Sequence, residues 1–105
     1  MKKNKSSVLV GFVLFSLAAF SIPTSAADLA AGKSKAIVCT SCHGANGISI
    51  SPDIPNLAGQ KALYLAKAIR DYKSGERKNG MMSAVVGTIS DADIENISAY
   101  FSSLK

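Results

Sequence analysis

The amino-acid sequence predicts an all-α fold with about three main helices joined by long loops. Three segments carry apolar residues at helical spacing, and no segment shows the alternation of apolar and polar residues that marks a β-strand. Two connections, residues 44–57 and 75–88, are long for so small a chain, and such loops are uncommon in a compact domain unless they surround something. We therefore expect helices and loops wrapped around one bound group.

Residues 1–26 have the pattern of a secretory signal peptide. Three lysines lie within the first five residues, and residues 8–20 form an uncharged apolar run that is shorter than the roughly 20 residues of a comfortable bilayer span. Small residues follow, so cleavage is expected after Ala26, with Ala27 as the second choice. The sequence has no Arg-Arg pair, which favours the general secretory route to the periplasm. The alternative is an uncleaved membrane anchor.

The remaining residues, 27–105, are expected to form one domain with no stable membrane insertion. They hold nine basic and seven acidic residues, so the formal net charge falls from +5 to +2 when the leader is removed. No dense basic stripe with interleaved aromatics remains, which argues against binding to nucleic acid. A core this small is marginal by itself and usually needs disulfides, a metal or a cofactor.

The helices are expected in the following order. The first runs over roughly residues 28–42, with Asp28 as its cap. The second starts near residues 58–60 and ends at about Lys73, with Gly75 as a stop. Its apolar stripe consists of Ala62, Leu65, Ile69 and Tyr72. The third starts at Ser90, where Ser90-Asp91-Ala92-Asp93 resembles a capping box, and its stripe consists of Ile94, Ile97, Tyr100, Phe101 and Leu104.

The motif Cys39-Thr40-Ser41-Cys42-His43 is the attachment signature of a c-type haem. Two thiols three residues apart can form thioethers with the two vinyl groups of one porphyrin. His43, the single histidine of the chain, then follows as the proximal iron ligand. Three alternatives are weaker: a disulfide leaves His43 without a role, a thioredoxin-like motif needs strands, and a zinc site needs about four ligands.

With these residues, the sequence resembles the class I c-type cytochromes. More narrowly, it resembles the small bacterial monohaem periplasmic type and one half of the dihaem two-domain cytochromes c. The segments that carry the resemblance are residues 39–44, Pro55-Asn56-Leu57-Ala58-Gly59-Gln60, Gly75-Glu76-Arg77, Met81-Met82, Ser90-Asp91 and Ala99-Tyr100-Phe101. The resemblance covers the whole mature chain and, because the motif occurs once, implies one covalently bound haem c.

The resemblance also implies a methionine as the sixth iron ligand. Met81 and Met82 both lie in the second long connection, and on an extended loop only one of two neighbours can face the iron. The family spacing to Ile89 selects Met82, with Met81 as second choice. A third reading leaves the iron open and has both side chains pack in the loop. A soft thioether ligand favours ferrous iron and raises the reduction potential.

Further positions are implied by the same resemblance. Pro55 either accepts a hydrogen bond from the proximal histidine through its carbonyl or is a turn proline. Arg77 and Lys78 are expected to be solvated, with binding to a haem propionate as the alternative. Gly32 is expected where the first helix crosses the last, near Tyr100 or Phe101.

The function implied is electron transfer, with no enzymatic activity and with redox partner proteins bound by transient contact. A monomer is expected, and a mature charge of +2 predicts no strong electrostatic steering. The alternative is a haem c ligand sensor or peroxidase-like enzyme with an open iron position, which would need a distal acid–base group. A third reading is a subunit with a passive haem. Carbon monoxide binding separates an open from a closed iron.

Overall fold

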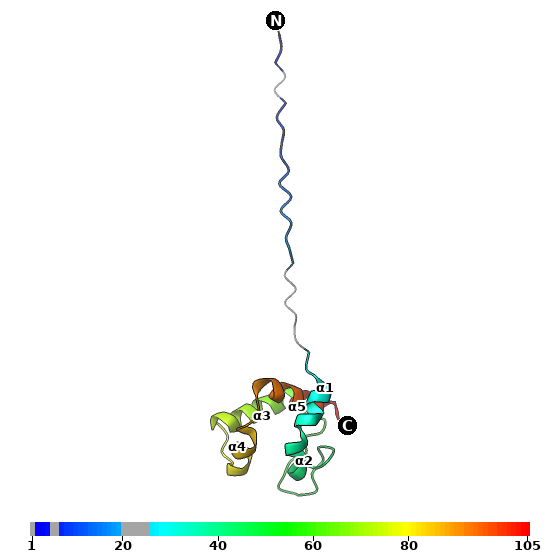
Figure 1. Cartoon of the computed structure of the whole chain (residues 1–105), viewed down its shortest axis with the longest axis vertical. Helices are drawn as coiled ribbons and strands as arrows, with labels where there is room; N and C mark the ends of the chain where they lie inside the picture. Colours follow the sequence, from blue (N-terminus) through cyan, green and yellow to red (C-terminus); the bar gives the residue numbers. More distant parts are fainter. Residues whose placement is uncertain (1, 5–6, 20–25) are drawn as a thin grey trace.

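The computed structural model describes residues 2–4, 7–19 and 26–105. Within them the chain forms five helices, which are α1 (Leu29–Lys35), α2 (Ile37–His43), α3 (Ala62–Ser74), α4 (Gly80–Val86) and α5 (Asp91–Ser103) (Figure 1). No strand occurs in this part of the chain. The prediction of an all-α fold with helices and loops in this order is confirmed.

The first and last helices cross closely, and Gly32 lies at the crossing. A Cβ atom at Gly32 would lie 2.0 Å from the backbone oxygen of Asn96 and 2.9 Å from the Cβ of Tyr100. The side chain of Asn96 also accepts a hydrogen bond from the backbone N–H of Asp28, at 2.9 Å. This contact between α1 and α5 therefore requires glycine. The resemblance implied such a crossing near Tyr100 or Phe101, and the structure places Gly32 next to Tyr100.

The first predicted helix is divided in two at Ala36. The N–H of Ala36 still bonds to the carbonyl of Gly32, but the N–H of Cys39 bonds three residues back to the carbonyl of Ala36, at 2.8 Å. A three-residue bond of this kind tightens the backbone and bends a helix. Ala36 is fully buried, so the bend is packed into the core and sets the direction of α2.

The second predicted helix begins later than residues 58–60. The N–H groups of Leu57 and Ala58 both bond to the carbonyl of Gly47, and the N–H of Gly59 bonds to the carbonyl of Phe101. These residues therefore join the first long loop to α5, and α3 starts only at Ala62. Its end is as expected, since Gly75 follows in the left-handed conformation with φ of 87°.

The sequence suggested that the second long connection, residues 75–88, is a loop throughout, but part of it is helical. It contains α4, whose N-cap Asn79 accepts a hydrogen bond from the N–H of Met82. Glycine has a low helix propensity, so Gly80 and Gly87 argue against a helix here. They lie at the two ends of α4, however, and do not interrupt it. Burial of Val86 in the core gives this short helix the support that its sequence lacks.

The core lies where α3, α4 and α5 meet the bend of the N-terminal helices. It consists of Ala36, Leu65, Ala66, Val86, Ile89, Ile94, Ile97 and Phe101. Helix α5 starts after Ser90, whose hydroxyl accepts from the N–H of Asp93 at 3.2 Å, as one half of the predicted capping box. Half-buried side chains of the predicted stripes, Ile69 and Tyr72 among them, pack at the edge of this core.

The predicted leader lies apart from the helices. Residues 7–19 form no helix, expose their side chains and run away from the helical body (Figure 1). Lys5, Phe20 and residues 21–25, which include Pro23 and the start of the small-residue segment, lie outside the described residues. Among the helices of the described ranges, none combines the length and apolar character needed to span a bilayer.

Candidate cofactor site

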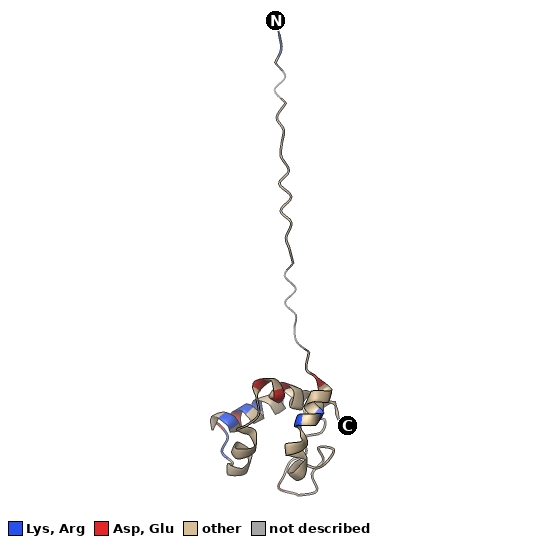
Figure 2. Ribbon diagram, in the orientation of Figure 1, with Lys and Arg blue, Asp and Glu red and all other residues tan. Residues whose placement is uncertain are grey.

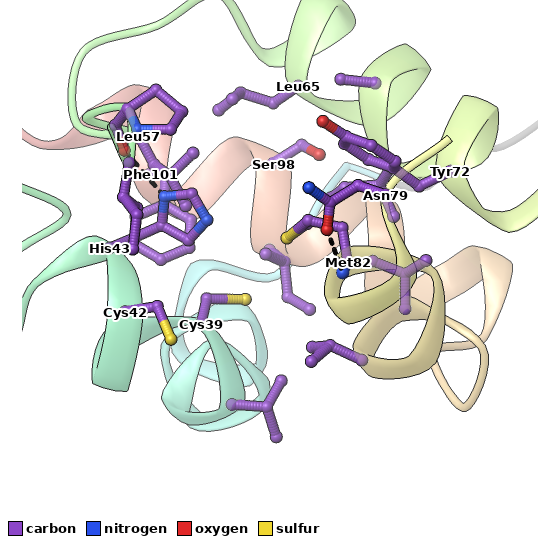
Figure 3. Close-up of a pocket in the computed structure, with 18 of the residues that line it drawn as sticks. Cys39, Cys42, His43, Leu57, Leu65, Tyr72, Asn79, Met82, Ser98 and Phe101 are labelled. Atoms are coloured by element: carbon purple, nitrogen blue, oxygen red, sulfur yellow. Dashed lines mark hydrogen bonds between the residues drawn. The ribbon is translucent and has the colours of Figure 1, made fainter. Parts of the chain in front are cut away.

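A largely apolar cavity of about 340 Å³ lies between α2, the first long loop, α3, α4 and α5. This volume is within the range of pockets that enclose small ligands and cofactors. Its lining includes Cys39, Cys42, His43 and Met82, so all four residues predicted to hold the cofactor meet at one place (Figure 3). The four are brought together from two segments almost forty residues apart in the sequence.

The two cysteines lie on α2, three residues apart and therefore on one face of the helix. Cys39 is half-buried and Cys42 is exposed, and both are free thiols. Burial raises the pKa of the Cys39 thiol to about 11, so the thiol is neutral near pH 7. A redox-active cysteine needs a readily formed thiolate, which disfavours the thioredoxin-like alternative. A thioether has no proton to lose and suits the apolar surroundings of Cys39.

His43 is the last residue of α2 and is buried. Its Nδ1 lies 2.7 Å from the carbonyl oxygen of Pro55. Because a carbonyl can only accept, Nδ1–H must donate this bond, which leaves the lone pair on Nε2 for a metal. Gly44 follows with φ of 91°, and a Cβ there would lie 1.9 Å from the oxygen of Ile48. The turn after α2 thus fixes the imidazole, and Pro55 does more than shape the chain before α3.

The two neighbouring methionines differ in their position on α4. Met82 is half-buried and its sulfur points from α4 toward the side of the cavity that His43 occupies (Figure 3). Met81 lies at the edge of the cavity and is 68% exposed. The prediction that Met81 and Met82 lie on an extended loop was wrong, because both lie on α4. Neighbouring side chains on a helix diverge by about 100° and do not point in opposite directions. Helical geometry still turns only Met82 inward.

The donor set of this cavity fits a haem c. Two thiols on one helical face can form thioethers, and an imidazole and a thioether sulfur supply one nitrogen and one soft sulfur ligand. Ser98 provides a further sign, because its buried hydroxyl lines the cavity and has no hydrogen-bond partner among the described residues. A buried unpaired hydroxyl costs about 1–3 kcal/mol. A group with polar atoms in the cavity would relieve that cost.

The sequence did not single out several polar residues of this site, Asn79 and Ser98 among them. Asn79 could have been found, since Asn directly before a short apolar run is an N-cap signal. Ser98 gives no such signal, because its burial depends on the packing of α5. The guanidinium of Arg77 lies 4.7 Å from the ring centroid of Tyr72, and both residues line the cavity. Arg77 is exposed, as expected of a solvated side chain.

The surface around the cavity mouth carries few charges. Helices α2 and α4 contain no Lys, Arg, Asp or Glu, and the charged residues gather mainly on α1, α3 and α5 (Figure 2). Asp53 is the one charged residue of the loop 44–57. Its pKa is lowered, chiefly by the hydrogen bond from the hydroxyl of Ser51, so this carboxylate is ionised at neutral pH. Asp53 and Arg77 line the mouth with opposite charges.

Comparison with known proteins places this site in a family context. A family model described as Cytochrome c matches residues 29–105. Cytochrome c4 of Pseudomonas aeruginosa is 43% identical over 93 residues, which are 89% of this chain and 46% of that protein. Cytochrome c-554(548) of Halomonas halodenitrificans is 44% identical over 81 residues, which are 74% of this chain and 98% of that protein.

A solved structure agrees with these matches. The crystal structure of reduced recombinant cytochrome c4 from Pseudomonas stutzeri superimposes with a TM-score of 0.72 at 43% identity. The match covers 76% of this chain and 47% of that one. A thiosulfate dehydrogenase (TsdBA) from Marichromatium purpuratum also has a TM-score of 0.72, at 29% identity over 20% of its chain. The chain thus spans about half the length of the cytochrome c4 relatives that it matches.

Proposed function

Because the chain belongs to the cytochrome c family, whose members bind haem c covalently, we propose that it is an electron carrier with one haem. The observation that carries the proposal is the meeting of two cysteines, one histidine and one methionine in a single apolar cavity. The two protein ligands come from α2 and α4, on different sides of that cavity (Figure 3). If His43 and Met82 both bound the iron of a haem held here, that iron would have no free position for a substrate.

Each residue of the site has a separate task in this proposal. Haem supplies an iron that alternates between ferrous and ferric states. Cys39 and Cys42 would hold the ring through thioethers, and His43 would bind the iron through Nε2. The carbonyl of Pro55 holds the imidazole in one tautomer and one orientation. Met82 contributes a neutral sulfur that favours the reduced state.

The chain offers little of what a haem enzyme needs. Its single histidine is already bonded to Pro55, so no second imidazole can act as a distal acid–base group. Asp53 lies at the cavity mouth, where its lowered pKa keeps it from donating protons at neutral pH. These features favour a carrier that is not an enzyme. The alternative is a ligand sensor or peroxidase-like enzyme with an open iron position, and carbon monoxide binding tests it.

The surface around the cavity mouth suits brief contacts with other redox proteins. Oppositely charged Asp53 and Arg77 and the uncharged helices α2 and α4 leave no single sign of charge there. Electrostatic steering is then weak, and binding depends on apolar contact such as that offered by exposed Val38 and Met81. We propose a monomer that works by such transient contacts.

Export of the chain is part of the same proposal. Residues 1–26 act as a signal peptide for the general secretory route, and residues 27–105 work in the periplasm. This division agrees with the extent of the family match, which begins at residue 29, and with the start of α1 at Leu29. The intact mass of the exported protein should equal the chain from residue 27 or 28 plus one haem. A full-length mass would indicate an anchor.

The sixth ligand decides between a carrier and an open haem. The oxidised protein should show the weak near-infrared charge-transfer band of an iron–sulfur bond, and the reduced protein should bind carbon monoxide slowly. Met82→Ala should remove the band, lower the reduction potential and allow rapid carbon monoxide binding. Met81→Ala is the matched control and should keep the band, because Met81 is mostly exposed.

Three other outcomes have distinct meanings. Loss of the band in Met81→Ala alone would move the ligand by one residue and leave the carrier function intact. Rapid carbon monoxide binding by the wild-type protein would refute the carrier proposal in favour of the sensor or enzyme. A closed iron without electron exchange with small oxidants would indicate a passive haem.

A further inference from the structure

Asn79 makes a direct hydrogen bond to the backbone of the proposed iron ligand. Its side-chain oxygen Oδ1 accepts from the N–H of Met82 at 3.0 Å (Figure 3). Its own backbone is extended, with φ of −155° and ψ of 117°, and its carbonyl accepts from the N–H of Ser83 at 2.9 Å. This is the geometry of an N-cap residue, and Met82 is the third residue of the helix that it caps.

Helix α4 depends strongly on such a cap. It has seven residues, and isolated helices shorter than about 12–15 residues are marginal in water. Its sequence includes one glycine and two valines, which are poor helix formers, and it has no basic residue in its last turn. Only Val86 is fully buried.

Two further bonds hold α4 or the chain after it, and both are made by residues other than Asn79 and Met82. The hydroxyl of Ser83 donates to the carbonyl of Tyr72 at 3.2 Å, which ties the helix to α3. The ammonium group of Lys73 donates to the carbonyl of Ile89, beyond the helix end. If the Asn79 bond is lost, the body of α4 keeps these contacts and the buried Val86. The effect is therefore concentrated on the residues before Ser83, which include Met82.

We propose that Asn79 is a positioning residue that keeps the Met82 sulfur directed into the cavity by capping α4. The inference rests on the proposed ligation of iron by Met82. The cap bond ends on the N–H of Met82 itself, so it restrains the φ angle of the same residue whose side chain reaches the iron. Asn79 lowers the fraction of molecules in which the sulfur has left the iron.

The size of the effect follows from the capping equilibrium. Replacing an N-cap Asn by Ala changes a helix equilibrium by roughly fivefold. Carbon monoxide can bind ferrous iron only after the sulfur has left, so the observed binding rate scales with the fraction of open molecules. Asn79→Ala should therefore bind carbon monoxide roughly fivefold faster than the wild-type protein. Asn79→Ser, which keeps a capping oxygen, should stay within about twofold of wild type.

Ser90→Ala is the matched control. It removes the cap of α5, where the Ser90 hydroxyl accepts from the N–H of Asp93, and α5 carries no proposed iron ligand. Its thermal stability should fall about as much as that of Asn79→Ala, while its carbon monoxide binding rate should stay at the wild-type value. The haem-loaded, reduced protein is mixed with carbon monoxide in a stopped-flow instrument, and the near-infrared band of each oxidised variant is recorded.

The results for the three variants and the wild-type protein distinguish the positioning role of Asn79 from the ligation of iron by Met82. Faster binding in Asn79→Ala alone, with recovery in Asn79→Ser, supports the positioning role. Equal acceleration in Asn79→Ala and Ser90→Ala would show general loosening and overturn it, as would a Ser variant that behaves like the Ala variant. A wild-type protein that lacks the near-infrared band would refute ligation by Met82 and the role of Asn79 together.

Discussion

The crossing of α1 and α5 allows a quantitative prediction for Gly32→Ala. The added methyl carbon would lie 2.0 Å from the Asn96 oxygen, whereas such contacts are essentially never below 3.0 Å, so the two backbones must separate by about 1 Å. Both sides of the contact are rigid, because the obstacle is backbone and the neighbour is the Cβ of Tyr100. The hydrogen bond from Asp28 to Asn96 spans the same crossing and would be stretched.

The expected cost can be worked out from these contacts. Overpacking in a tight core costs about 1–3 kcal/mol, and rigid backbone places this site at the upper end. The higher helix propensity of alanine stabilises a helix interior by up to about 1 kcal/mol relative to glycine, which offsets part of this cost. A net loss of about 2 kcal/mol remains. In a domain of this size each kcal/mol lowers the melting temperature by about 4–8 °C, so Gly32→Ala should melt roughly 8–16 °C below the wild-type protein.

The assay is thermal unfolding of the haem-loaded protein, followed by far-ultraviolet circular dichroism. Gly80→Ala is the matched control, because it is also a helical glycine but has no atom within 4 Å of its added carbon. The control should melt at or slightly above the wild-type temperature. If Gly32→Ala melts within about 2 °C of wild type, the crossing is not rigid and the reasoning from close backbone contact is wrong.

Other predictions address the role of haem in folding, the charge around the cavity mouth and the titration of Asp53. Cys39→Ala combined with Cys42→Ala should leave a largely unfolded or degraded chain, because the small core loses the group that its loops surround; wild-type helical dichroism in that haem-free protein would contradict this. Oxidation of the reduced protein by hexacyanoferrate(III) and by tris(phenanthroline)cobalt(III) should change less than about threefold between about 0.01 and about 0.15 M salt, and a change of about tenfold would reveal a strongly charged mouth. Ser51→Ala should raise the pKa of Asp53 toward its ordinary value, measured by NMR titration of the carboxyl carbon. The pKa of Asp53 is lowered in the folded protein, so its ionised carboxylate stabilises the fold at pH values above the pKa of Asp53 in the unfolded chain. This stabilisation is lost as the pH falls through the pKa of Asp53 in the folded protein. An unchanged titration of Asp53 in Ser51→Ala would show that the Ser51 hydroxyl is not the main cause of the lowered pKa.

The sequence by itself determined the fold class, the family resemblance and the candidate ligand set. Local patterns carry these features: helical stripes with caps at Asp28 and Ser90, a left-handed stop at Gly75, and the short motif of residues 39–43. Each depends on neighbours within a few residues, so no tertiary contact is needed to predict it. The choice of Met82 over Met81 came from the spacing implied by the resemblance.

Tertiary structure decided the bend at Ala36, the late start of α3 and the existence of α4. Each of these depends on contacts that form only in the folded chain: Ala36 buried in the core, Gly59 bonded to Phe101 of α5, and Val86 buried in the core. Weak local propensity for helix in residues 80–86 was overridden by that burial and by the Asn79 cap. The burial of Ser98 likewise exists only once the helices are assembled, because a serine in a sequence says nothing about which face of its helix meets a cavity.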